Sequence, residues 1–236
     1  AIDNMSFRSE RDQTINNLTI NYLPALTRQH TYNLAATLYP YGTQPNGEVG
    51  YQADVIYKIK KGSKIGGKYG TSVALNYSQV NSMDVEKYAK ITDPDSTRMG
   101  YETNFFTPGG GDVKYFRDLN VEISRKMNKK VKVKASYIHL LYNMAVVQGL
   151  GGKPTFNSEI AVVDVLYKIK PKHAIRIEAQ HLWTQHDLKN WATAVAEYTF
   201  SPNWFVAIMD QYNYGGSNIH YIYGSAGYTK GGNRIM

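Results

Sequence analysis

The sequence predicts an all-β fold, namely an antiparallel up-and-down transmembrane β-barrel. Three observations predict it. Apolar and polar residues alternate along most of the chain from Thr14 onward, and tight turns alternate with longer loops. The alternating segments run for about ten to fourteen residues, close to the ~9–11 that cross a bilayer at a tilt. Because successive side chains on a strand face opposite sides, each segment has one apolar face and one polar face.

Composition narrows the class. The 236 residues include 20 Tyr and 20 Gly, 13% of them are aromatic, and the net charge is +8. No stretch reaches the ~18 consecutive apolar residues of a membrane-spanning helix, although barrel strands need only one apolar face. Cysteine is absent, which excludes disulfides and thiolate metal sites. The chain begins at Ala1 without a visible signal peptide, which predicts a processed chain or a fragment.

The first strands follow from the alternation of β-branched and aromatic residues with polar ones. Residues 51–60 are the clearest case, with Tyr51, Val55 and Tyr57 on one face and Asp54 and Lys58 on the other. The same pattern predicts strands at 17–22, 32–38, 69–78, 119–124 and 131–137.

The later strands repeat this pattern. Residues 161–169 closely resemble the strand at 51–60, because both share the run of Asp, Val, Tyr, Lys, Ile and Lys in the same order. Further strands are predicted at 175–183, 193–200 and 204–208, with one more beginning at 221. Eleven strands result, and the sequence predicts no helix of three turns or more.

The connections fall into two sets, a habit of outer-membrane barrels. Tight turns are predicted at 27–30, 61–66, 127–130, 171–173, 201–203 and 230–233. The interleaved connections are 42–48, 80–112, 145–157, 186–190 and 215–218. We expect the tight, basic turns to be periplasmic and the others extracellular, with 80–112 as a long extracellular loop.

A soluble sandwich or lipocalin-like barrel is the alternative, but its strands are usually about 5–6 residues long.

The membrane interpretation makes the polar face a water-filled lumen. Its predicted lumen-lining residues are Asp54, Lys58, Glu122, Lys132, Lys134, Asp164, Lys168, Arg176, Glu178 and Glu197. Aromatic side chains concentrate at membrane interfaces. The predicted girdle comprises Tyr57, Tyr77, Tyr167, Trp183, Trp191, Phe200 and Trp204.

The strand count predicts that residues 1–236 form a single β-barrel domain that is part of a larger barrel. Bacterial single-chain barrels normally have an even number of strands, and an open sheet edge is unstable in lipid. A turn at 230–233 also leads into a new strand. We therefore expect a barrel of 14 or more strands, or closure by another chain.

Lys and Arg cluster around three of the tight turns, at 58–68, 125–134 and 168–176. These cations either attract anionic solutes or an acidic partner, or they reach lipid headgroups from the ends of the strands. Nucleic-acid binding would need stacking aromatic residues beside the cations on one open face, so no nucleic-acid partner is expected.

The sequence predicts no catalytic, cofactor-binding or metal site. A membrane-embedded hydrolase would need a partner for His181 or His186, and no motif supplies one. Asp93, Asp95 and Asp112 offer oxygen ligands, but their spacing fits no calcium loop.

The last stretch, YIYGSAGYTKGGNRIM, contains a Gly-Tyr-Thr-Lys-Gly-Gly-x-Arg turn at 227–234. Together with the Lys-rich alternating strands, it resembles a poorly characterised family of large outer-membrane β-barrels from Bacteroidota. The resemblance implies an outer-membrane location in a Gram-negative bacterium and further strands beyond the turn, and it supplies no catalytic residues.

The sequence thus predicts an outer-membrane protein acting as a porin-like channel for small polar solutes. The alternative is a structural or assembly subunit with a plugged barrel, and a membrane-embedded hydrolase is a remote third. Expected partners are outer-membrane lipids and lipopolysaccharide, with other outer-membrane proteins or lipoproteins as further candidates.

Overall fold

A computed structural model describes residues 7–8, 19–20, 26–44, 47–87, 101–103, 107, 109–186, 188–230 and 233–235. Its main element is a ten-stranded sheet in the order β14-β13-β12-β11-β10-β9-β8-β7-β4-β3. The strands are β3 (Val49–Ile59), β4 (Thr71–Asn81), β7 (Lys114–Lys126), β8 (Val131–Asn143), β9 (Thr155–Lys170), β10 (His173–Trp183), β11 (Trp191–Phe200), β12 (Trp204–Asn213), β13 (Ile219–Lys230) and β14 (Asn233–Ile235). Every neighbouring pair is antiparallel.

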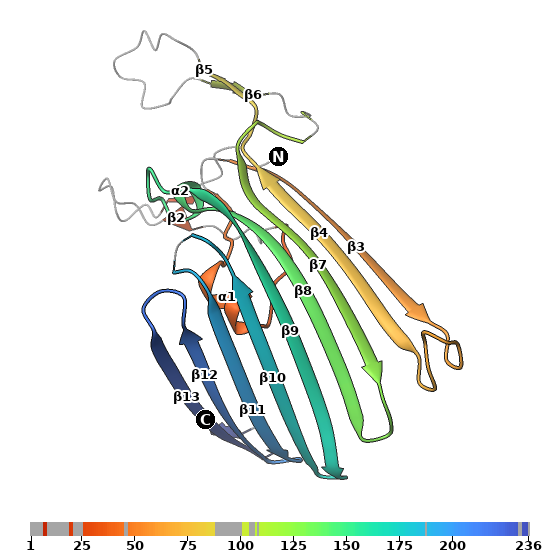
Figure 1. Ribbon diagram of the computed structural model, residues 1–236. Coiled ribbons are helices and arrows are strands. Elements are labelled where there is room, and N and C mark those ends of the chain that lie inside the picture. The colour runs from red at the N-terminus through yellow and green to blue at the C-terminus, as the bar shows by residue number, and fades with distance from the viewer. Residues whose placement is uncertain are drawn as a thin grey trace.

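The predicted all-β, antiparallel, up-and-down fold is therefore confirmed (Figure 1). Within the described residues the sheet is open, and β3 and β14 form its two edges. The new strand expected after the turn at 230–233 is β14.

The remaining elements are short. Strand β1 (Phe7–Arg8) pairs with β2 (Thr19–Ile20), and β5 (Val85–Lys87) pairs with β6 (Tyr101–Thr103) inside the long connection between β4 and β7. The helices are α1 (Asn33–Leu38) and α2 (Met144–Val147). Among the described residues, no helix is both long enough and apolar enough to cross a membrane.

The two kinds of connection lie at opposite ends of the sheet (Figure 1). At the turn end, β7 ends at Lys126 and β8 begins at Val131, and only residues 201–203 separate β11 from β12. At the loop end, the connection from β4 to β7 carries the β5–β6 hairpin, and α2 opens the connection from β8 to β9. The predicted alternation of the two sets of connections holds for the main sheet, but the division by length does not hold throughout. The turn-end connection 60–70 is longer than the loop-end connections 184–190 and 214–218.

The strand predicted at 32–38 is wrong, because Asn33–Leu38 form helix α1. Alternating Tyr32, Leu34 and Leu38 suggested a strand, but Leu34 and Leu38 are also one helical turn apart and share a face. Pro40 follows closely, and proline does not continue a helix. The tight turn predicted at 27–30 is likewise not a hairpin, since it leads into α1. Of the strand predicted at 17–22, Thr19–Ile20 form β2 and the rest lies outside the described residues.

The pleat separates two faces of the sheet. We call the outer face the one that carries Val55, Tyr57, Ile177 and Ile208, whose exposed fractions are 60, 66, 56 and 57%. We call the inner face the one that carries the neighbouring residues, including Asp54 in β3. Many large apolar side chains are thus exposed on the outer face.

The core lies on the inner face toward the loop end. We call residues 26–44 the inner segment; it contains α1 and supplies Tyr32, Leu34, Ala35 and Tyr39 to this core. From the sheet and α2, the core receives Val80, Phe116, Ile138, Leu140, Tyr142, Met144, Phe156, Ile160, Val162, Leu182 and Trp191. Rings pack at angles, as in the edge-on contact between Tyr39 and Phe156, whose centroids are 5.4 Å apart.

Candidate functional site

The inner segment is held to the inner face by a buried ionisable pair. His30 Nε2 lies 2.6 Å from Asp118 Oδ2, and the two side chains are 9 and 0% exposed. Asn120 Nδ2 donates a second hydrogen bond of 3.0 Å to the other Asp118 oxygen. A buried carboxylate is costly unless it is paired and hydrogen-bonded, so this pair fixes where the segment lies on β7.

Arg28 extends the same contact toward the turn end. Its Nη1 donates to Asn120 Oδ1 at 2.8 Å, and its Nη2 lies 3.5 Å from Glu122 Oε2. Lys134 Nζ on β8 lies 3.7 Å from the other Glu122 oxygen. Glu122 therefore joins a cation from the inner segment and one from the sheet.

Helix α1 contacts the opposite half of the sheet. The Leu34 backbone N–H, which lacks a partner inside the first helical turn, donates to Gln180 Oε1 on β10 at 3.0 Å. Gln180 Nε2 in turn donates to Glu178 Oε1 at 2.6 Å. Asn33 Nδ2 lies 2.8 Å from the Met209 sulfur on β12. The inner segment thus crosses the sheet from β7 to β12.

A charge network lies beside α1. Arg176 Nε donates to Asp164 Oδ2 at 3.0 Å, and Arg176 Nη2 also contacts Glu178. Glu178 is buried and Arg176 is half-buried. One guanidinium therefore contacts two carboxylates from adjacent strands.

All ten residues predicted to line a lumen lie on the inner face. The structure brings five of them together. Glu122 contacts Lys134 beside the inner segment, Arg176 contacts Asp164 and Glu178, and Lys134 lies opposite Asp164 in register. Asp54 accepts from Asn76 at 2.7 Å, and Glu197 accepts from Thr199 at 3.2 Å. Lys58, Lys132 and Lys168 are exposed and form no ion pair among the described residues.

Six of the seven residues predicted to form the aromatic girdle share one face of the sheet. Six members lie on the outer face: Tyr57, Tyr77, Tyr167, Trp183, Phe200 and Trp204. Trp191 contradicts the prediction, because it pairs in register with Leu182, lies on the inner face and is 5% exposed. It stacks on Tyr221 with centroids 5.8 Å apart and belongs to the core.

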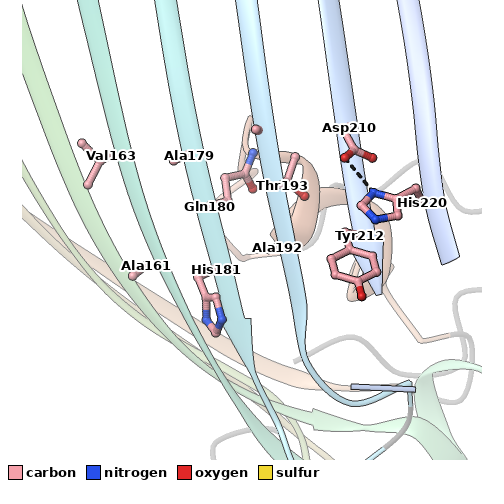
Figure 2. A pocket seen from close by; sticks show the side chains of 11 residues that line it. Ala161, Val163, Ala179, Gln180, His181, Ala192, Thr193, Asp210, Tyr212 and His220 are labelled. Carbon is pink, nitrogen blue, oxygen red and sulfur yellow. Dashed lines mark hydrogen bonds and ion pairs between the residues drawn. The ribbon is translucent and has the colours of Figure 1, made fainter. Parts of the chain in front are cut away.

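A depression of about 540 Å³ lies across β9 to β13 (Figure 2). Ala161, Val163, Ala179, Ala192 and Ala194 form its floor, and their short side chains leave the space open. At one side His220 Nδ1 lies 2.8 Å from Asp210 Oδ2, and the His220 ring stacks on Tyr212 at 3.9 Å. The sequence analysis missed this Asp–His pair. It lies on the outer face, where Tyr212 pairs in register with His220 and Asp210 with Ile222.

The histidines considered for catalysis contact aromatic residues. His181 Nε2 lies 2.6 Å from the Tyr214 hydroxyl, and its ring centroid is 4.0 Å from that of Trp183. His186 lies 6.1 Å from the Phe156 ring. In the described part of the chain, no three His, Asp or Glu side chains are grouped so that they could hold a metal ion. Asp93 and Asp95 lie outside the described residues.

A polar contact closes the inner segment at the loop end. The Tyr41 hydroxyl donates to Glu48 Oε2 at 2.6 Å, and the Gln44 backbone N–H donates to the same oxygen at 2.9 Å. Glu48 is only 3% exposed. Burial raises the pKa of Glu48, and the hydrogen bonds from Tyr41 and Gln44 oppose part of that rise.

Fold and site together define an all-β protein whose outer face exposes apolar side chains. Its inner face has a charged turn-end half and an apolar loop-end half that the inner segment covers. The chain belongs to a family of unknown function, DUF6029, whose model matches residues 1–236. No curated protein and no solved structure matches the chain.

Proposed function

We propose that this chain forms part of the wall of an outer-membrane β-barrel and that the barrel conducts small polar solutes past the inner segment. The separation of the two faces is the observation that carries the proposal. Ile222, Val206 and Trp204 are 70, 55 and 52% exposed on the outer face. A soluble protein rarely leaves so many large apolar side chains of one sheet face in water. Contact with acyl chains accounts for it.

The inner face supports a wet interior in its turn-end half. There Lys58, Lys132 and Lys168 are exposed, and the neighbouring carboxylates already have partners. Charged side chains in this number would be costly against lipid, but they are ordinary in a barrel lumen. The tight turns then lie in the periplasm and the longer loops lie outside the cell, with phospholipid and lipopolysaccharide as the lipid partners.

The inner segment determines how much of this interior is open. Over the loop-end half, Leu34, Tyr142 and Leu182 are at most 1% exposed, so the segment packs directly on the sheet at these positions. We propose that the segment narrows the conducting path to the space beyond it, next to the charged half of the inner face. Closure of the barrel falls to strands that pair with the edges β3 and β14.

The packing of the inner segment on this core favours a second candidate, which is a structural or assembly subunit with a plugged barrel. Planar-bilayer recording separates the two. The channel proposal predicts discrete current steps in salt solution from the purified protein, and larger steps when His30→Ala loosens the inner segment. A structural subunit predicts silence from both proteins and co-purification of other outer-membrane proteins. Silence from both, with the protein demonstrably inserted, would contradict conduction.

A further inference from the structure

Four lysines line the inner face at the turn end, one on each of four strands. We call Lys58, Lys126, Lys132 and Lys168 the lysine row. All four are exposed, and none forms an ion pair within the described parts of the chain. Their positions on β3, β7, β8 and β9 place them at one rim of the sheet.

Two members of the row lie directly opposite each other. Lys126 and Lys132 are register partners across β7 and β8. Like charges in this position destabilise a sheet. The other register partners supply no compensating acid: Lys132 faces Leu166, Lys58 faces Ser72 and Lys168 faces Ala174. The sheet leaves this repulsion in place, and an anion held between the ammonium groups would relieve it.

The carboxylates of the inner face lie farther from the turn end, and protein groups already occupy them. Glu122 contacts Arg28 and Lys134, while Asp164 and Glu178 both contact Arg176. Asp118 contacts His30, and Asp54 accepts from Asn76. At the turn end of β3, β7, β8 and β9 the inner face therefore carries only lysine charge, while Asp54 and Glu197, whose partners are the neutral Asn76 and Thr199, keep their negative charge farther along their strands.

The adjoining turns add charge of the same sign. Lys61 and Lys64 lie in the turn after β3, Lys129 and Lys130 in the turn after β7, and Lys172 in the turn after β9. The sequence contains no Asp or Glu between residues 55 and 83, 123 and 158, or 165 and 177. A mouth lined by one sign of charge raises the local concentration of the opposite ion.

We infer that the turn end of the inner face is an anion-selective mouth, with the lysine row as its selectivity element for small inorganic and carboxylate or phosphate anions. The inference rests on the proposed channel, because it requires the inner face to line a conducting path. Rings of Lys or Arg are the usual basis of anion preference in pores. Selectivity should weaken at high ionic strength, since the Debye length falls from ~8 Å at 0.15 M to ~3 Å at 1 M salt.

The test is the reversal potential of the purified full chain in a phosphatidylcholine bilayer, whose lipid carries no net charge, under a potassium chloride gradient. The expected result is a reversal potential with the same sign as the equilibrium potential of chloride. The variant Lys132→Glu combined with Lys168→Glu should move the reversal potential toward that of potassium. The control Lys153→Glu makes the same kind of charge change at an exposed position of the loop end and should leave the reversal potential unchanged.

Each other outcome has a distinct meaning. If the unaltered protein carried current with a reversal potential of zero, or of the sign expected for potassium, anion selectivity would be overturned and the channel proposal would stand. Lys153→Glu changes half as much charge as the double variant, so a shift half as large or larger would assign selectivity to overall charge and would also overturn the role of the lysine row. Absence of current would contradict the channel proposal and this inference together.

Discussion

Trp183 and Trp191 lie on opposite faces of the sheet, although they flank the same loop. Trp191 pairs in register with Leu182, the residue before Trp183, so the pleat turns the two indoles away from each other. Trp183 is 44% exposed and Trp191 is 5% exposed. One indole is therefore available to a solvent or lipid that contacts the outer face, and the other belongs to the core beneath the inner segment.

Replacing His30 by Ala should release the inner segment from β7. The change leaves one oxygen of the buried Asp118 carboxyl without its hydrogen-bond partner, and an unsatisfied buried polar group costs about 1–3 kcal/mol. We expect faster proteolysis within residues 26–44 and faster exchange of the Leu34 amide hydrogen. The neighbouring exposed residue Gln29, changed to Ala, is the matched control. Equal protection in both variants would show that the His30–Asp118 contact does not hold the segment.

Replacing Leu34 by Ala should destabilise the protein through the core. Leu34 is 0% exposed, and truncation of a buried leucine costs about 2–5 kcal/mol. Leu26→Ala is the control, because Leu26 lies in the same segment and is 53% exposed. The midpoint of denaturant unfolding measures both. If the two variants unfolded at the same midpoint, α1 would not be packed on the sheet as described.

Glu48 should make the protein less stable as the pH rises. Its pKa is raised by burial, so the folded state binds the proton more tightly than the unfolded chain does. The stabilisation is complete below the ordinary value of 4.5 and is lost as the pH rises through the pKa of the folded state.

The Glu48→Gln variant keeps the shape and cannot ionise, so it should lack this part of the pH dependence. The free energy of unfolding, measured from pH 4 to pH 8 for both proteins, is the test. Parallel curves for the two proteins would mean that Glu48 ionises as freely in the folded state as in the unfolded one.

Gly227 should not tolerate a side chain. It faces Phe205 across β12 and β13, and a Cβ atom added at Gly227 would clash with the Phe205 ring. We expect Gly227→Ala to displace the ring and to cost about 1–3 kcal/mol. Gly224→Ala on the same strand is the control, because a Cβ there would meet nothing within 4 Å. A stabilising effect of Gly227→Ala would show that the ring does not cover this glycine.

Alternation alone was enough to predict the two faces of the sheet. It placed Asp54, Glu122 and Arg176 on one face and Val55 and Tyr57 on the other, because the side-chain period of a strand is fixed at two residues. Trp191 was assigned to the girdle because it lies beside a loop, and not from its register. It lies two residues before Thr193 in β11, so the same alternation places it on the face opposite to Phe200.

The inner segment could not be predicted from the sequence for a different reason. Six residues are too few for periodicity to distinguish a helix from a strand, and Asn33–Leu38 fit both patterns. Its position depends on contacts between residues far apart in the chain, such as His30 with Asp118. No local pattern in the sequence specifies such a pairing.

Quenching of tryptophan fluorescence by brominated phospholipid tests the proposed orientation most directly. The chain has three tryptophans, so three variants that each keep one and carry Phe at the other two report on each position. In brominated bilayers, we predict strong quenching of Trp183 and Trp204 and little quenching of Trp191. Quenching of Trp191 alone, or of none of the three, would contradict a sheet whose outer face contacts lipid.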